Sequence, residues 1–176
     1  MSATHPTARE ASELRDYLVS ELLREQPATR RVIEAMPDKK LGYRPEPRLM
    51  DFVNLALHLA QAGHYFADFI EKRSASAHDG GDDTRVVPHA AVELAREVDR
   101  LLALAVDRFR HAPAERLAHR VEFKGFGAFP GVTFIQWHLS HLIHHRAQLG
   151  MYLRMAGERV PPIYGPTADG RPTESP

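Results

Sequence analysis

The chain has 176 residues, of which 43% are hydrophobic and 26% are charged, a balance typical of one soluble globular domain. Lys and Arg together number 23, as do Asp and Glu, so no net charge attracts nucleic acid or an anionic membrane, and neither is an expected partner. Cysteine is absent, which excludes disulfides, zinc ribbons and a thiol nucleophile of the protein's own. Any metal ion must therefore be held by nitrogen and oxygen atoms.

The sequence also indicates where the protein works and how it is divided. The first residues lack the basic-then-apolar order of a signal peptide, and no apolar run approaches the ~20 residues that a membrane-spanning helix needs. A cytoplasmic location is expected. We expect one domain over residues 1–176, with a helical part at about 8–156 and a tail at 157–176.

The first half of the chain reads as two helices joined by a loop. Apolar residues at helical spacing predict a helix from Ala8 to Met36, bent at Pro27. A loop with three prolines follows, from Pro37 to Leu49. Asp51 is the expected N-cap of a second helix that ends near Lys72. The polar stretch at 74–84 is expected to be a flexible surface linker.

The second half predicts two more helices. The third runs from about Pro88 to Phe109. The sequence VEFKGFGAFP at 121–130 alternates, which predicts a short extended segment, too brief for a sheet domain. The last helix spans Val132 to Ala156 and ends at Gly157. These elements predict an all-α fold, a four-helix bundle with long connections and a proline-rich C-terminal tail.

Histidine is the unusual residue of this sequence, with 11 copies. A turn of about 100° per residue places His138, His141 and His145 on the apolar arc of the last helix. The same arithmetic points His58 inward from the second helix and His64 outward. His141 and His145 are one turn apart, a separation at which two imidazoles can ligate one ion, and His58 is the inward candidate for a third ligand. A lone inward histidine is usually a hydrogen-bonded core residue. Four of them cannot all satisfy one another, which favours a metal site.

The roles of the neighbouring polar residues stay open. His138 fits a ligand, a hydrogen-bond partner of a ligand, or plain core. His144 lies on the flank of the arc, where it contacts solvent or caps a loop. Four other side chains are expected near the predicted ion from their positions around the helices: Gln61, Tyr65, Gln148 and Tyr152. Each fits equally well as a hydrogen-bond partner of a ligand or as a residue at the rim of the core.

Other metal and phosphate chemistries do not match. No Glu follows His141, so the HExxH protease signature is absent. The Glu-x-x-His repeats of carboxylate di-iron proteins are also absent. The glycines between Gly125 and Gly131 lack the context of a phosphate-binding loop. Three neutral imidazoles suit one divalent transition metal ion, Zn or Ni. The sequence identifies no catalytic residue.

The stretch HLSHLIHHRAQLGMYLRMAGERVPPIYGP, from His138 to Pro166, resembles the closing helix of the DinB-like superfamily, which includes the YfiT-type metal-dependent hydrolases. The match is His141-x-x-x-His145-Arg146-x-Gln148 and the Tyr152-Leu153-Arg154 run. Upstream, LGYRPEPRLMDFVNLALHLAQAGHYF is similar to the family's loop and second helix, with His58 at its isolated ligand histidine. One departure is Ala147, where the family usually has Gly. It lies away from the ligand face, so a packing adjustment is expected.

The resemblance implies a four-helix bundle in which His58, His141 and His145 hold one divalent ion with an open coordination position. Its relatives include mycothiol-dependent maleylpyruvate isomerases and bacillithiol S-transferases. The expected function is therefore a metal-dependent enzyme, a thiol-dependent S-transferase or isomerase, whose partners are a small-molecule substrate and a low-molecular-weight thiol. A homodimer is an open alternative to the monomer. Two other functions stay open, a metal-dependent hydrolase and a non-catalytic metal-binding structural or interaction bundle.

Overall fold

The computed structural model describes residues 5–72, 74–75, 88–123 and 125–169. Most of the predicted linker and the end of the predicted tail lie outside these residues. The chain is mostly helical, as expected. Its long helices are α1 (Ala8–Glu34), α2 (Phe52–Lys72), α3 (Ala91–His111) and α5 (Val132–Met155), and η1 (Asp38–Lys40) is a single 3-10 turn.

The N-termini of the first two long helices are fixed by side-chain caps. In α1 the Thr7 hydroxyl accepts a hydrogen bond from the backbone N–H of Glu10, and the Glu10 carboxylate accepts one from the backbone N–H of Thr7. This capping box satisfies two backbone donors. The helix continues through Pro27 to Glu34. In α2 the Asp51 carboxylate accepts from the backbone N–H of Asn54 at 2.8 Å, so the predicted N-cap is confirmed.

The C-terminus of α5 is fixed by Gly157, as predicted. Gly157 has a φ of 79°, a left-handed conformation that glycine adopts without steric cost. Its N–H donates to the Arg154 carbonyl at 3.0 Å, and the N–H of Glu158 donates to the Leu153 carbonyl at 2.8 Å. These two bonds form a Schellman motif, which satisfies the last carbonyls of the helix.

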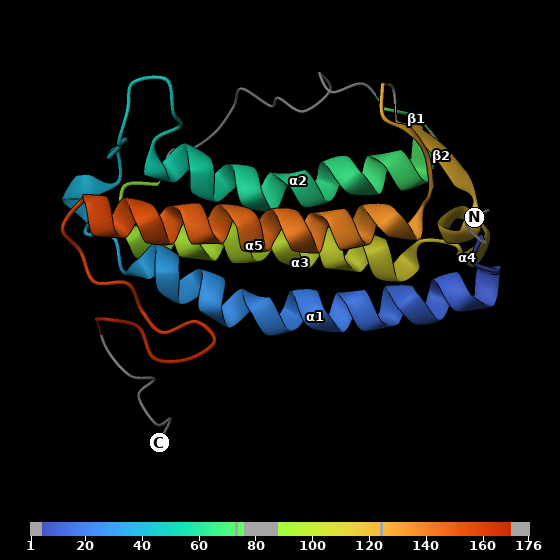
Figure 1. The fold of residues 1–176 in the computed structure, drawn as a ribbon, viewed down its shortest axis with the longest axis horizontal. Helices are drawn as coiled ribbons and strands as arrows, with labels where there is room; N and C mark the ends of the chain where they lie inside the picture. The colour runs from blue at the N-terminus through green and yellow to red at the C-terminus, as the bar shows by residue number, and fades with distance from the viewer. Residues whose placement is uncertain (1–4, 73, 76–87, 124, 170–176) are drawn as a thin grey trace.

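The four long helices lie side by side (Figure 1). Helix α2 contacts α3 and α5, and α1 contacts the same two helices from the other side. The core between them is apolar and includes fully buried Phe52, Phe69, Phe109 and Phe134. Within the described residues, no helix is long and apolar enough to cross a membrane.

The all-α prediction is wrong at one end of the molecule, where a small sheet forms. Strands β1 (Ser74–Ala75), β2 (Arg120–Phe123) and β3 (Gly127–Pro130) pair in the order β1-β2-β3. The β2 and β3 strands are antiparallel, and β1 and β2 are parallel. Gly125 and Gly127 have φ values of 87° and 104°, so they supply the left-handed residues of a tight turn. The alternation at 121–130 is thus a hairpin.

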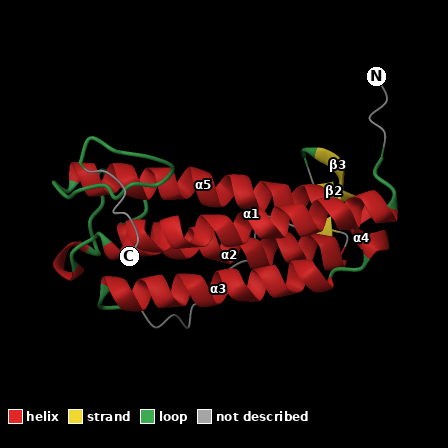
Figure 2. Ribbon diagram, turned by 90° about the horizontal axis from the view of Figure 1, so that it is seen from below, coloured by secondary structure: helices red, strands yellow, loops and turns green. Residues whose placement is uncertain are grey.

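A short helix also separates the third and last long helices. Helix α4 (Ala114–Ala118) begins after Pro113, which occupies its N-cap position. This short helix was not predicted from the sequence. Leu117 of α4 is fully buried, so the short helix closes the same end of the molecule as the hairpin (Figure 2).

At the opposite end, the described part of the tail returns along the helices. Lys40 pairs with Glu158 at 2.6 Å, and Arg154 pairs with Asp169 at 2.9 Å. A hydrogen-bonded cluster around a buried arginine adds a third attachment. Arg146 of α5, which is 1% exposed, donates to the carboxylate of Glu25 on α1 and to the Tyr164 hydroxyl of the tail.

Candidate metal centre

Three histidines from two helices converge, as predicted. His58 comes from α2, and His141 and His145 come from α5. Their potential ligand nitrogens all lie within 4.8 Å of one another. Among the described residues, these three imidazoles form the group of side chains that could hold a metal ion. Nε2 of His58 lies 3.1 Å from Nε2 of His141. The ring centroids are 4.8 Å apart for His58 and His141, 4.8 Å for His58 and His145, and 4.2 Å for His141 and His145.

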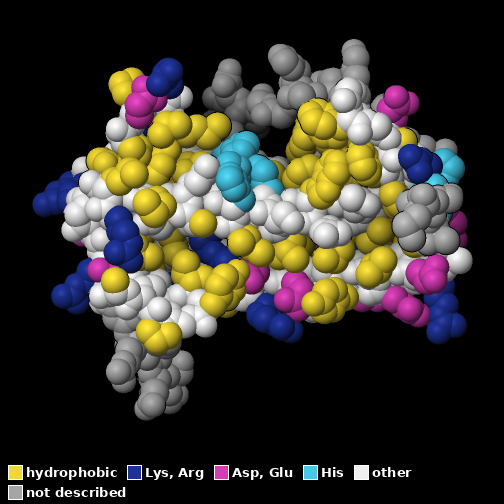
Figure 3. All heavy atoms as spheres, in the orientation of Figure 1, with side chains coloured by type: hydrophobic (Ala, Val, Ile, Leu, Met, Phe, Trp, Pro, Cys, Tyr) yellow, Lys and Arg dark blue, Asp and Glu magenta, His cyan; other side chains and the backbone are white. Residues whose placement is uncertain are grey.

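Packing between α2 and α5 brings the three rings together. His58 is half-buried and lies next to Leu59, while Leu55 and Ala62 lie one turn before and after it, and all three neighbours are buried. Their burial orients this side of α2 toward the core and α5. The histidines remain accessible from one face of the molecule, where a histidine patch over α2 and α5 lies between two hydrophobic areas (Figure 3).

The surroundings of His141 and His145 favour their neutral imidazole forms. Burial, followed by the neighbouring imidazoles of His145 and His58, lowers the pKa of His141 to about 3. Burial also lowers the pKa of His145, although its hydrogen bond to Gln148 opposes this shift. A neutral imidazole offers a lone pair to a cation, whereas a protonated one does not.

Gln148 fixes the orientation of one candidate ligand. Its Oε1 atom lies 2.6 Å from Nδ1 of His145. Because a carbonyl oxygen only accepts, Nδ1 carries the proton and Nε2 retains its lone pair. Such a bond to the outer nitrogen is the usual support for a metal-binding histidine. The imidazole nitrogens, the lowered pKa values of His141 and His145, and the orientation of the His145 ring all fit a divalent transition metal ion.

His138 lies outside this group, although it is one turn from His141. Its side chain is 0% exposed, and neither ring nitrogen has a hydrogen-bond partner among the described residues. The ring lies 6.3 Å from that of Phe66 and 5.8 Å from that of Phe109. Burial lowers its pKa to about 3. Of the three roles left open by the sequence, its placement matches a core residue.

The other predicted site residues are spread over a wider region. Gln61 and Tyr65 are half-buried on α2, and the Tyr65 ring packs edge-on against Phe69 at 4.6 Å. Tyr152 lies further along α5, where its hydroxyl donates to the Met50 carbonyl at 3.2 Å. Gln148, in contrast, contacts His145 of the centre directly.

The two flanking histidines differ from each other. His144 is exposed, as expected, with its ring 4.8 Å from that of His145. The outward placement predicted for His64 is wrong, because α3 covers that side of α2 and leaves His64 half-buried. Burial and the charges of Arg108 and Arg100 lower its pKa.

Gly63 has a packing role that was not predicted from the sequence. A Cβ atom at this position would lie 2.5 Å from Cβ of Ala105 and 2.8 Å from Nε2 of His138. The glycine therefore allows α2 to approach α3 and leaves room for the His138 ring. A glycine inside a helix is unfavourable by itself, so its presence was the available signal of a close contact.

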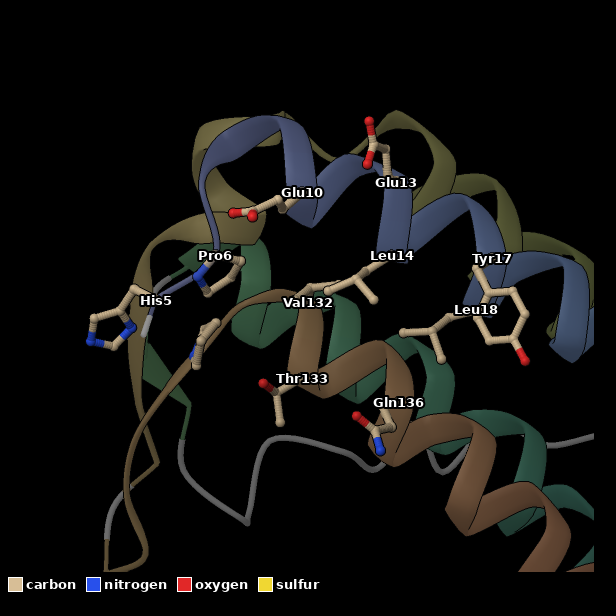
Figure 4. Close-up of a pocket in the computed structure, with 11 residues that line it drawn as sticks. His5, Pro6, Glu10, Glu13, Leu14, Tyr17, Leu18, Val132, Thr133 and Gln136 are labelled. Carbon is tan, nitrogen blue, oxygen red and sulfur yellow. The ribbon is translucent and has the colours of Figure 1, made fainter. Parts of the chain in front are cut away.

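A cavity of about 840 Å³ lies elsewhere, between the first turns of α1 and the start of α5. Leu14 and Leu18 of α1 face Val132 of α5 there (Figure 4). Its acidic groups are already paired, since Glu10 bonds to the capping Thr7 and Glu13 to Arg9. None of the three converging histidines lines it, so this cavity is separate from the candidate metal centre.

The chain belongs to the DinB family, whose model matches residues 9–172. Two solved structures have a similar fold. A DinB-like protein from Bacillus subtilis superposes with a TM-score of 0.66 at 23% identity, covering 84% of this chain and 97% of its own. A DinB-like protein from Bacillus cereus gives 0.67 at 20% identity, covering 85% and 97%. A comparison with curated proteins finds no match.

Proposed function

We propose that this protein binds one divalent transition metal ion, Zn or Ni, through His58, His141 and His145. The observation that carries the proposal is the convergence of three imidazoles whose ligand nitrogens lie within 4.8 Å of one another. The lowered pKa values of His141 and His145 support it, because both rings are neutral at physiological pH. A bound ion would act as a Lewis acid and lower the pKa of a thiol or water molecule beside it.

The proposed activity is that of a thiol-dependent S-transferase or isomerase acting on a small molecule. Three protein ligands suit a catalytic site, because a closed structural site of this type has four. The chain has no cysteine, so a low-molecular-weight thiol must supply the sulfur. A cytoplasmic location, with neither nucleic acid nor membrane as partner, is part of the proposal because that compartment keeps thiols reduced.

In this function the protein's own residues bind and orient. His58, His141 and His145 provide neutral nitrogens, and Gln148 holds the proton of His145 on Nδ1. The ring of Phe66, 6.2 Å from that of His141, keeps water away from the buried side of the site. We assign no acid or base to the reaction.

Metal analysis tests the ligand set. The purified protein should contain about one ion per chain, and His58→Ala, His141→Ala and His145→Ala should each lose it. His144→Ala is the matched control, because His144 adjoins the centre on α5 yet is exposed. Full occupancy in the His141→Ala variant would show that the ligand set is wrong.

A thiol panel with an activated aryl chloride tests the activity. The sulfur of the thiol forms a bond to the ring carbon, chloride leaves with its bonding electrons, and the thiol proton passes to buffer. Turnover that requires both thiol and metal supports the proposal. Metal-dependent ester hydrolysis without thiol turnover would favour the hydrolase. A bound ion with neither activity would favour a structural link between α2 and α5.

A further inference from the structure

A group of four aromatic side chains at the hairpin end forms a continuous surface, which we call the aromatic shelf. It consists of Phe123, Phe126 and Phe129 from the hairpin and Trp137 from α5. The rings of Phe123 and Phe126 are stacked, with centroids 4.7 Å apart and planes 19° apart. Trp137 lies 5.7 Å from Phe123 and 4.9 Å from Phe129. Together these side chains hold one another in place.

The shelf rests on a rigid base. Phe69 of α2 and Phe134 of α5 are both 0% exposed and stack at 5.0 Å. Phe123 packs edge-on against Phe69 at 5.1 Å, and Trp137 packs edge-on against Phe134 at 5.2 Å. A surface supported in this way loses little conformational freedom when it binds another molecule.

Phe126 distinguishes the shelf from a simple hydrophobic cap. A cap closes the end of a core and buries its own side chains, yet Phe126 is 71% exposed. Its ring nevertheless stacks on Phe123 instead of turning into the core. Exposed aromatic rings that form a contiguous hydrophobic patch are typical of surfaces that bind a ligand.

The shelf lies next to the candidate metal centre along α5. Trp137 is one helical turn before His141, so both side chains leave α5 on the same side. Below the surface, buried Phe66 lies 6.2 Å from the ring of His141 and 6.4 Å from that of Phe134, which supports the shelf. The hydrophobic areas beside the histidine patch are visible in Figure 3.

The helices that carry the site also lack formal charge around it. Residues 52–67 of α2 and 132–145 of α5 contain no Asp, Glu, Lys or Arg. Three neutral imidazoles leave the charge of a divalent ion uncompensated, which favours an anionic donor as the next ligand.

We propose that the aromatic shelf binds the body of the substrate, and that this substrate is a flat, apolar molecule with an anionic metal-binding group. The inference rests on the proposed metal site, since the anionic group needs the ion. It goes beyond that site by assigning the substrate class and the residues that recognise it.

Calorimetry on the zinc-loaded protein tests the proposal with benzohydroxamate and acetohydroxamate, which share the metal-binding group and differ in the ring. Benzohydroxamate should bind about tenfold more tightly, a factor that corresponds to about 1.4 kcal/mol. Trp137 is the single tryptophan of the chain, so its fluorescence should also change with benzohydroxamate alone. Equal affinities of the two probes would overturn the proposal.

Variants separate the shelf from the metal. Phe126→Ala should reduce the preference for benzohydroxamate to about threefold and leave zinc binding unchanged. Tyr17→Ala is the matched control, because Tyr17 is 61% exposed on α1, and it should keep the full preference. An unchanged preference in Phe126→Ala would contradict the proposal. A zinc titration with no binding would instead refute the metal site, which makes the two failures distinguishable.

Sedimentation of the same proteins tests another occupant. A wild-type dimer that Phe126→Ala converts to a monomer would identify the shelf as a subunit interface and overturn the substrate assignment. The same oligomeric state in both proteins leaves the shelf exposed to small molecules, as the proposal requires.

Discussion

His138 shows what a buried imidazole without a hydrogen-bond partner does to stability. Its pKa is lowered to about 3 in the folded protein, whereas an unfolded chain binds the proton at a pH of about 6.5. Between these values the unfolded state holds more protons, so stability decreases as pH falls. Above about pH 6.5 the His138 imidazole is neutral in both the folded and the unfolded protein, so it causes no pH-dependent loss of stability.

We therefore expect His138→Leu to be increasingly more stable than wild type toward acid. The difference in the free energy of unfolding between His138→Leu and wild type should be about 2 kcal/mol larger at about pH 5 than at about pH 7.5. This value follows from about 1.4 kcal/mol per pH unit below the unfolded-state pKa of about 6.5. Urea unfolding of the metal-free proteins measures it. Leu149→Met is the control, since it alters a buried apolar residue of α5 without a titratable group. A pH-independent difference for His138→Leu would contradict the prediction.

Gln148 contacts His145, so we expect it to affect a bound ion only through that histidine. Gln148→Leu should lower zinc affinity about tenfold, within the range of about 10- to 100-fold known for such supporting residues. The reason is that the Nδ1 proton of His145 loses its acceptor. Calorimetric zinc titration measures the effect. Gln136→Leu, at an exposed glutamine of α5, should bind zinc like wild type, and equal affinity in both variants would rule out the role of Gln148.

At the scale of whole elements, two helical glycines make opposite predictions. Gly63→Ala should destabilise the protein by about 1–3 kcal/mol, because the new Cβ atom overlaps Ala105 and His138 at the approach of α2 to α3. Gly150→Ala should be neutral or stabilising by up to about 1 kcal/mol, since its Cβ atom would meet Val160 at an ordinary 3.6 Å. Denaturant unfolding checks both, and equal effects would contradict the packing argument.

The limits of the elements were predicted well where the signal was local. Asp51 marked the N-terminus of α2, and Gly157 marked the C-terminus of α5. Both signals are local, because a capping side chain and a left-handed glycine act within one turn of the helix. The hairpin was foreseen only as an extended segment. Its pairing joins β2 to β3 and also to β1, which is distant in sequence, and such pairing has no short-range signature.

At the scale of the whole molecule, a metal ion would connect α2 to α5. An ion that binds only the folded state should raise the free energy of unfolding by about 2.7 kcal/mol at a free concentration 100 times its Kd. Thermal unfolding with and without zinc measures this. His58→Ala should abolish the increase, because one helix then loses its ligand. An equal increase in that variant would show that zinc binds elsewhere.

Arg146 illustrates a residue whose role depends on the fold. It follows His145 directly and belongs to the stretch that resembles the family, yet its side chain leaves α5 toward Glu25 of α1 and Tyr164 of the tail. A helix turns about 100° per residue, so consecutive side chains reach different neighbours. The family stretch thus contains a part that faces the histidine centre and a separate structural part.

The sequence by itself determined that His141 and His145 share one side of a helix and that His58 faces inward, because helical periodicity is a local property of the chain. It also determined the neutral net charge and the absence of a protein thiol. Only the tertiary structure decided that His138 enters the core beside Gly63, that His64 is covered by α3, and that the hairpin aromatics and Trp137 of α5 form one cluster. These outcomes depend on which distant segments pack together, and close packing of particular side chains settles that choice.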